Sequence, residues 1–312
     1  MPQQTPGQAR VIDPVLTEIA RGYRNANMVG LSLFPEVPVV VRGGKIIEFG
    51  KESLQLYDTE RAPGAATKRV QFGYLGKTFA LVQHSVEGLV PIENIQEASA
   101  GPGIDLGRGA VAEVQDIIAL KTEKTMADLA TTAGNYAAGN TVALAGASQW
   151  SDLANSDPVA DIETAKETVR GKIGREPNTV VIGAAVMSKL KQNVKIIDRI
   201  KYTGRDAVTP AVLAAAFDVE NVVVAKPVFA DAGGALTDVW GKNVIVAYTN
   251  LASLASRGQP SFGYTYRLRG YPIVEEAYPS RNRKSWLYPV TDELSPVIAG
   301  SDAGYLIQAA VA

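Results

Sequence analysis

The feature that most constrains this chain is one uninterrupted helical pattern of unusual length. It runs from Ile104 to about Thr131, and Gly134, Asn135 and Gly139 follow it. At 1.5 Å per residue, about 25 residues make a helix about 38 Å long, whereas a globular helix usually has about 11–12 residues. The predicted apolar stripe consists of Leu106, Ala110, Val114, Ile117, Ile118, Lys121, Thr125 and Leu129. The charged residues predicted to lie elsewhere on the helix are Glu113, Asp116, Glu123, Lys124 and Asp128.

The residues near the amino terminus predict extended structure without a core of its own. A short helix is expected to begin at Asp13, which can cap it, with Pro14 in the first helical position. Residues 31–41 are apolar and extended, but Pro35 and Pro38 remove two backbone donors. This segment is therefore confined to a sheet edge or to a strap over another surface. We interpret the first forty-odd residues as an arm.

A long hairpin is predicted next. Its strands are expected over residues 45–49, 68–75 and 77–83, with a mostly polar stretch over 50–67 between them. Loops beyond about 12–15 residues are uncommon in compact domains and are usually functional. A two-stranded hairpin alone is marginally stable in water. We therefore expect this extension to pack against another surface, and a neighbouring subunit is one candidate.

After Asp157 and Pro158 the pattern alternates between helices and strands. Helices are expected over 158–173, 184–191 and 209–217, and strands over 179–182, 221–225 and 239–248. The first of these helices should bury Ile162, Ala165, Val169 and Ile173. Such alternation predicts a small mixed sheet with helices packed against it. Further strands are expected over 260–269, 285–290 and 305–311.

The residue types present exclude several kinds of site. The chain has no cysteine and one histidine, so disulfides, thiolate metal sites, cysteine nucleophiles and poly-histidine metal sites are excluded. The formal net charge of −1 offers no basic excess for sequence-independent binding to nucleic acid. No apolar run approaches the roughly 18–20 residues that span a bilayer, and the first residues lack a signal-peptide core. We expect a soluble protein made inside the cell.

Two glycine-rich segments resemble nucleotide-binding loops but fail the pattern. In Gly44–Glu52, five residues separate the first two glycines, and a carboxylate stands where a Walker loop needs a hydroxyl group. The segment Gly107–Ala112 matches G-x-G-x-x-A, but a loop rather than a strand precedes it. We reject both as phosphate sites.

The remaining candidates for chemistry also favour structural roles. Ser85 directly follows His84, and adjacent side chains on a strand point to opposite faces, so the two do not form a nucleophile–base pair. The carboxylate pairs Glu275 with Glu276 and Asp231 with Asp238 lack the ligand spacing of a calcium loop. The basic run 281–284 is flanked by acidic residues, which favours a salt-bridged or subunit-contact surface. We predict no catalytic, cofactor-binding or metal-binding residue.

Several segments resemble, in order, the major capsid proteins of tailed bacteriophages, which have the Hong Kong 97-like fold. The segments that carry the resemblance are 13–17 with Gly22 and Tyr23, 33–39, 43–46 with 49–52, 58–64, 260–265 and 302–307. Each is weakly specific, and together they cover nearly the whole chain. The order of parts, from arm through hairpin and long helix to α/β module and returning strands, fits the same family.

The resemblance implies an α+β fold with four parts. It implies an N-arm over 1–42, an extended E-loop over 43–85 and an axial domain over 158–265. A peripheral domain would comprise 86–157 and 266–312, with its spine helix at about 104–132. It further implies hexamers and pentamers that close an icosahedral shell around double-stranded DNA, which would be bound weakly and without specificity.

The resemblance also implies partners and a place of action. No long charged segment precedes the arm, so a separate scaffolding protein is expected, together with a portal and a possible decoration or cement protein. The shell would be assembled in the cytoplasm of the host bacterium and would mature from a procapsid. Lys51 and Lys68 lie in the loop, but the family's lysine–asparagine cross-link is not assignable from this sequence.

The arm and hairpin would gain stability by lying on neighbouring subunits, because their apolar faces have no core of their own. The expected contact residues are Phe34, Val37, Val39, Leu54, Tyr57, Arg61, Pro63 and Phe72. Two alternatives remain open. One is a shell of the encapsulin type, which shares the fold but encloses protein cargo. The other is an α/β enzyme or small-molecule-binding protein with its site in 158–265, against which the lack of nucleophiles, bases and metal ligands argues.

Overall fold

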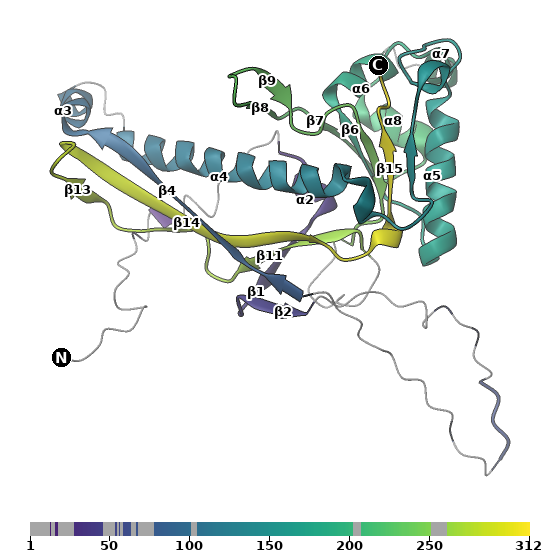
Figure 1. Ribbon diagram of the computed structural model, residues 1–312, viewed down its shortest axis with the longest axis horizontal. Helices are drawn as coiled ribbons and strands as arrows, with labels where there is room; N and C mark the ends of the chain where they lie inside the picture. Colours follow the sequence, from purple (N-terminus) through teal and green to yellow (C-terminus); the bar gives the residue numbers. More distant parts are fainter. Residues whose placement is uncertain are drawn as a thin grey trace.

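Two sheets and one long helix form the framework of this protein. The computed structural model describes residues 13, 16–17, 28–45, 54, 56, 59–63, 67, 78–100, 105–201, 207–250 and 261–312. A long six-stranded sheet lies against helix α4 (Leu106–Thr131), and a five-stranded sheet stands near the carboxyl end of that helix (Figure 1). The predicted mixture of helix and sheet, with a long helix over 104–131, is confirmed.

The six-stranded sheet is organised around its longest strand, β14 (Ser285–Ile298). The strand order is β1 (Glu36–Val39), β11 (Gly263–Leu268), β14 and β12 (Ile273–Val274), and β4 (Val82–Pro91) and β13 (Tyr278–Ser280) also pair with β14. Strand β1 runs parallel to β11, and the other pairings are antiparallel. The edge position of β1 confirms the interpretation of its two prolines, since proline cannot donate to a ladder.

Helix α4 packs along β14 and β4 with one face. Its buried side chains include Val111, Val114, Ile118, Met126 and Ala130. The predicted stripe was wrong by about one position, because Ile117 is 51% exposed whereas Glu123, predicted to lie outside, is 3% exposed. The helix begins where Asp105 Oδ1 accepts from Arg108 N at 3.1 Å.

The five-stranded sheet holds most of the core. Its order is β5 (Thr141–Ala143), β15 (Gly304–Gln308), β10 (Val244–Ala247), β6 (Thr179–Gly183) and β7 (Asn221–Ala225). All residues of β6 and β10 are buried. Helix α5 packs on β15 and β10, and α2 together with the last turns of α4 approaches the sheet from the other side in Figure 1. Coverage from both sides explains the continuous apolar sequences of these strands.

Five helices surround this sheet, and α5 and α8 begin at the predicted signals. They are α2 (Gly30–Leu33), α5 (Pro158–Ile173), α6 (Ala184–Leu190), α7 (Val194–Ile200) and α8 (Pro210–Phe217), while α3 (Ile92–Ala100) lies at the far end of the six-stranded sheet. Asp157 Oδ1 accepts from Ala160 N at 3.1 Å, and Gly174 ends α5 with a φ of 68°. Left-handed backbone of this kind favours glycine.

Most of the predicted α/β elements are confirmed, and the bounds of several strands are corrected. The strand predicted over 77–83 is two strands, β3 (Thr78–Ala80) and β4, the second of which continues to Pro91, and the strand predicted over 260–269 begins at Gly263. The strand predicted over 239–248 begins at Val244, because a tight turn at Gly241, with a φ of 57°, precedes it. The strand predicted over 285–290 continues to Ile298, because Asp292 and Glu293 are paired with arginines inside the sheet. The strand predicted over 305–311 ends at Gln308. Helices α2, α3 and α7 were not predicted.

Two small hairpins extend from the framework. Strands β2 (Gly43–Lys45) and β3 (Thr78–Ala80) pair antiparallel, as do β8 (Val228–Ala230) and β9 (Leu236–Asp238). The first pair forms the base of the predicted long hairpin, whose strands over 46–49 and 68–75 fall outside the described residues. The predicted cap at Asp13 is confirmed, since its Oδ1 accepts from Leu16 N at 3.0 Å.

The strand pairing departs from the predicted domain boundaries at two places. Strands β5 and β15 lie in segments assigned to the peripheral domain, yet both pair within the five-stranded sheet. Conversely, β11 begins at Gly263, inside the predicted axial segment, and belongs to the six-stranded sheet. Register between strands, which sequence patterns do not reveal, decides these memberships.

Candidate assembly surfaces

The segment that was interpreted as an arm is partly built into the core. Residues 30–33 are helical rather than extended, and Leu33 and Phe34 have no exposed surface. The Phe34 ring lies 5.5 Å from that of Phe262, between centroids. The expectation that Phe34 meets a neighbouring subunit is therefore corrected, because its side chain is enclosed by its own chain. Val39 is also largely buried, and Val37 is half-buried.

Glu123 ties this segment to the rest of the molecule. Its Oε1 accepts from Val29 N at 2.9 Å and from Trp240 Nε1 at 2.8 Å, and its Oε2 accepts from Gly30 N at 2.9 Å. Burial raises the pKa of the Glu123 carboxyl group, while these N–H donors act in the opposite direction. One carboxyl group thus joins the amino-terminal segment, the long helix and the loop before β10.

The close approach at this junction requires a glycine. A Cβ atom at position 30 would lie 2.4 Å from Met126 Sδ and 2.7 Å from Glu123 Oε2. Such contacts are far shorter than van der Waals distances, so a larger residue would displace the segment from α4. A weak signal for this site is present in the sequence, because Glu123 lies between Ile118 and Met126, which are both buried on the same helix.

Ion pairs hold the segment from Glu36 to Arg42 against the six-stranded sheet. Arg267 donates to Glu36 at 2.7 Å and contacts Asp292 at 3.2 Å. Arg42 forms two hydrogen bonds to the carboxylate of Glu293, at 2.7 and 3.1 Å. These contacts cross β1, β11 and β14, so the chain is firmly positioned where it enters β2.

The base of the long β2–β3 loop, residues 46–77, is anchored in the same way. Phe79 of β3 is buried and stacks on Tyr266 of β11, with ring centroids 4.3 Å apart. A Cβ atom at Gly44 would lie 2.9 Å from the Phe79 ring, so glycine permits the close pairing of β2 with β3. The loop therefore leaves the body from a fixed position.

Apolar side chains are exposed around this loop and within it. Val40 and Val41 precede β2 and Val82 begins β4, and each is more than half exposed. Among the described loop residues, Leu54 is half exposed and Leu56 is fully exposed. Exposed apolar side chains at the base of the loop and in the loop itself make this part of the chain a candidate interaction surface.

The structure also places the other predicted contact residues. Arg61 and Pro63 are exposed, while Tyr57 and Phe72 fall outside the described residues. Leu54 lies near the end of α5, since a methyl group at Gly174 would be 3.4 Å from Leu54 Cδ2. Leu54, Arg61 and Pro63 therefore lie between β2 and β3, whereas Phe34 and Val39 precede β2 and are buried.

The rejected chemical candidates take structural positions. His84 lies within β4 opposite Asp292, and burial, followed by the charge of Lys121, lowers its pKa. Ser85 Oγ is 3.1 Å from Thr291 Oγ1 on the neighbouring strand. Gly107 lies in the first turn of α4, where a Cβ would be 2.8 Å from the Tyr288 ring. Within the described ranges, no group of three or more histidine, cysteine, aspartate or glutamate side chains could hold a metal ion.

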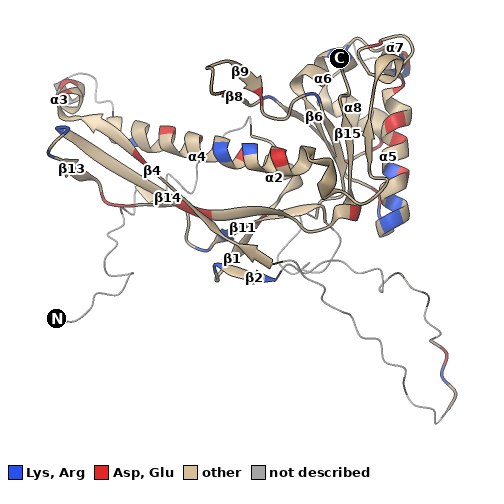
Figure 2. Ribbon diagram, viewed as in Figure 1, with Lys and Arg blue, Asp and Glu red and all other residues tan. Residues whose placement is uncertain are grey.

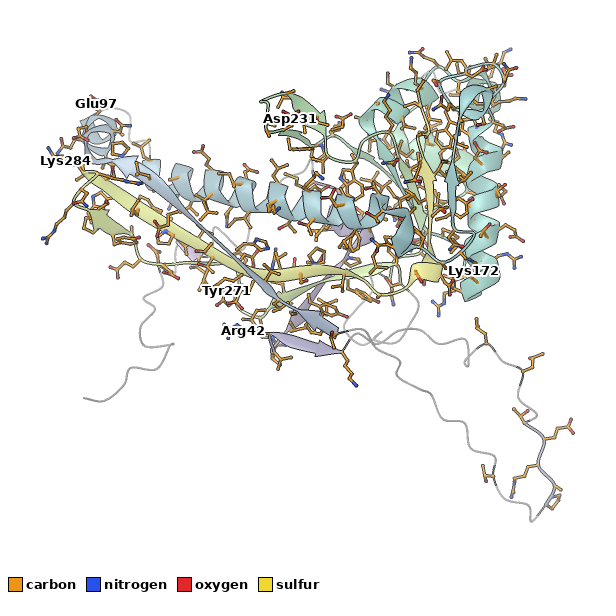
Figure 3. The ribbon with its side chains drawn as sticks, in the orientation of Figure 1. Arg42, Glu97, Lys172, Asp231, Tyr271 and Lys284 are labelled. Atoms are coloured by element: carbon orange, nitrogen blue, oxygen red, sulfur yellow. The ribbon has the colours of Figure 1, made fainter. Side chains whose placement is uncertain are left out.

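The charged runs also occupy turns and surfaces. Asp231 Oδ1 accepts from Gly233 N and Ala235 N, at 2.8 and 2.9 Å, and so shapes the turn between β8 and β9. The basic run 281–284 forms the turn between β13 and β14, and Lys284 O accepts from Ile92 N, at the start of α3, at 3.0 Å (Lys284 is labelled in Figure 3). Within the part of the chain that the structure describes, no helix is long and apolar enough to cross a membrane.

Comparison with known proteins identifies close relatives. The family described as Phage major capsid protein E matches residues 119–266. The chain is 42% identical to the major capsid protein of Burkholderia phage BcepMu, over 96% of both proteins. A phage-related protein from Bordetella bronchiseptica has a crystal structure that superposes with a TM-score of 0.83 at 44% identity, covering 97% of this chain and 98% of that one. An encapsulin from Synechococcus elongatus shares the fold at a TM-score of 0.52 and 11% identity, over 99% and 91%.

Proposed function

Because this chain belongs to the family of phage major capsid proteins, we propose that its copies form hexamers and pentamers that close an icosahedral shell around double-stranded DNA. The relatedness extends over almost the whole length of both proteins, so it concerns the complete fold. The phage relatives are far more similar to this chain than the encapsulin is. Protein in such a shell is located in the virion and acts structurally, without catalysis.

The observation that carries this proposal is the anchored loop with exposed apolar side chains. A loop fixed at its base by Phe79 and Tyr266, with Leu54 and Leu56 exposed to solvent, loses free energy when it buries them on another copy. Obligate interfaces of this kind bury about 2,000–5,000 Å² or more.

The proposal assigns parts of the chain to the known layout of the family. Residues 1–42 act as the N-arm, 43–85 as the E-loop, 86–157 and 266–312 as the peripheral domain, and 158–265 as the axial domain, with β5 and β15 added to the axial sheet. Contacts with neighbours would use Val37, Val39, Leu54, Tyr57, Arg61, Pro63 and Phe72. A scaffolding protein, a portal and a decoration protein remain predicted partners.

Deletion of residues 50–67 tests the proposal. We expect a folded, soluble subunit that no longer makes closed particles, because the deletion leaves the strands β2 and β3 and both sheets intact. Circular dichroism and thermal melting check the fold, and sedimentation with electron microscopy counts particles. Closed particles in normal yield from the deletion variant would refute the role of the loop.

A milder variant and a content measurement complete the test. Replacing Leu54 and Leu56 with serine keeps the length of the loop and removes its exposed apolar side chains, so we expect a partial loss of particles. The nucleic-acid content of particles assembled with a packaging system separates a DNA-filled shell from a protein-filled one. Particles that enclose protein cargo and exclude DNA would favour the encapsulin type.

A further inference from the structure

The hairpin of β8 and β9 presents an apolar face that no described part of the chain covers. Ala230 pairs directly with Leu236, and Val228 lies two residues from Ala230, so all three side chains share one face. Each is exposed, and Leu236 is 75% exposed. The hairpin extends from β7 beside α4, away from the body of the five-stranded sheet (Figure 1).

The opposite face of this hairpin is held against the molecule. Phe229 alternates with Val228 and Ala230, and it is half-buried against the main core. Lys124 Nζ of α4 lies 5.3 Å from the centre of the Phe229 ring. The apolar face therefore points outward because the hairpin is fixed from behind.

The charge on the hairpin is purely negative. The segment 227–238 contains Asp231 and Asp238 and no cationic residue. Asp231 is labelled at the tip of the hairpin in Figure 3. A surface with apolar side chains and acidic neighbours fits a partner surface with apolar side chains and basic neighbours.

The helix α7 provides such a surface on the same chain. Val194 and Ile197 are three residues apart, so they lie side by side, and both are exposed. The cationic residues in this region are Lys189, Lys191, Lys195, Arg199 and Lys201, and Asp198 is its one acidic residue. Helix α7 lies at the upper right in Figure 1 and Figure 2, whereas the hairpin extends to the left of the sheet.

We propose that the β8–β9 face of one copy docks on the exposed face of α7 in the next copy. The inference rests on the proposed function, since it names a partner surface within the assembled shell. The two surfaces lie on opposite sides of the five-stranded sheet and differ from each other. A contact between unlike surfaces repeats head to tail, which is the kind of contact from which the ring of a hexamer or pentamer is built when the rotation between copies closes.

A nucleic-acid partner fits this hairpin poorly. Its two carboxylates would repel phosphates, and the exposed Leu236 offers no hydrogen bond. In the sequence, the cations around α7 alternate with the exposed apolar Val194 and Ile197, which offer phosphates no contact. A second copy satisfies both surfaces at once.

Two substitutions at one position provide the test. Leu236→Lys and Leu236→Glu remove the same apolar side chain and introduce opposite charges. We expect Leu236→Lys to yield about tenfold fewer closed particles than Leu236→Glu, because like charges then face each other across the contact. Particle yield is measured by sedimentation of the full-length chain, and circular dichroism confirms that both variants fold.

Charge reversal on α7 supplies the rescue. Adding Lys195→Glu and Arg199→Glu to the Leu236→Lys chain should restore particle yield to within about twofold of the Leu236→Glu value. The matched control is Leu89→Lys on β4, an exposed leucine outside the proposed contact, which the α7 substitutions should not rescue. Asp231 stays unchanged throughout, because it forms the turn.

The outcomes separate this inference from the proposed function. Equal yields from the two Leu236 variants, a lower yield from Leu236→Glu, or failure of the rescue would overturn the docking proposal while the unaltered chain still assembles. An unaltered chain that makes no closed particles, even with a scaffolding protein supplied, would instead overturn the proposed function.

Discussion

The two sheets of this protein differ in how completely their own chain covers them. All residues of β6 and β10 are buried, whereas burial alternates along β4, whose covered residues face α4. Continuous burial is typical of a sheet covered on both faces, and alternation of a sheet covered on one. The central strands of the five-stranded sheet are thus enclosed by their own chain, whereas β4 of the six-stranded sheet leaves one side open to other contacts.

The largest expected effect comes from making the same substitution in both regions. Leu213 of α8 is fully buried beside the five-stranded sheet, while Leu89 of β4 is 42% exposed. We expect Leu213→Ala to lower the free energy of unfolding by about 2–5 kcal/mol. Leu89→Ala should lower it by less than about 1 kcal/mol. Chemical denaturation measures both, and equal losses would contradict the comparison.

A smaller loss is expected at the junction between the regions. Glu123→Ala leaves Val29 N, Gly30 N and Trp240 Nε1 buried without their acceptor. We expect a loss of about 1–3 kcal/mol in the free energy of unfolding. Hydrogen exchange should also show faster opening of residues 28–34.

The control for this junction lies on the same helix. Glu113 is exposed, so Glu113→Ala should change stability by no more than about 0.5 kcal/mol. Identical behaviour of the two alanine variants would show that the buried carboxyl group does not hold the amino-terminal segment.

Substitutions at helix caps test whether the difference between the two sheet regions extends to the stability of their helices. Asp157 caps α5 and Asp105 caps α4, each accepting a backbone hydrogen bond of 3.1 Å. We expect Asp157→Ala and Asp105→Ala to cost about 1 kcal/mol each, because capping is local. Thermal denaturation compares them, and a markedly larger loss at one cap would mean that the helices contribute to the difference.

The smallest effect concerns pH and the one histidine of the chain. Burial lowers the pKa of His84 in the fold, so the unfolded chain binds a proton at a higher pH than the folded chain does. Stability from this group is therefore present above about pH 6.5 and is lost as the pH falls through the pKa of the folded state. Denaturation at pH 7.5 to 5.5 should show this slope, and His84→Gln should flatten it. If the stability of the unaltered chain and of His84→Gln depended on pH in the same way, His84 would not be the source of the slope.

Sequence patterns predicted the helices that pack on the five-stranded sheet well, for a physical reason. Helix α5 carries its own start and stop signals, and Ile162, Ala165, Val169 and Ile173 are all buried as expected. Local signals of this kind depend on residues close in the chain. Strand membership of β5 and β15 depends on partners far along the chain, such as Thr141 with Leu306 and Val244 with Ile307, so no local pattern indicated it.

The candidate site was only partly predictable for the same reason. The projecting loop was predicted from its length and polarity, and its described residues are exposed. Phe34 was misassigned because its apolar surroundings come from Phe262, far along the chain. Glu123 was missed because a charged residue predicts an exposed position unless its partners are known, and these partners are backbone groups of a distant segment.

The two prolines near β1 have a consequence for how this sheet ends. Pro35 O and Val39 O accept from Thr265 N and Arg269 N, so the odd-numbered residues of β1 direct their backbone groups toward β11. Pro38 therefore stands on the outer side, where an approaching extended chain would need an N–H group and meets a pyrrolidine ring instead. The outer edge of β1 therefore disfavours pairing with a strand of another copy, and with it fibre-like growth of the sheet, even when many copies are crowded together.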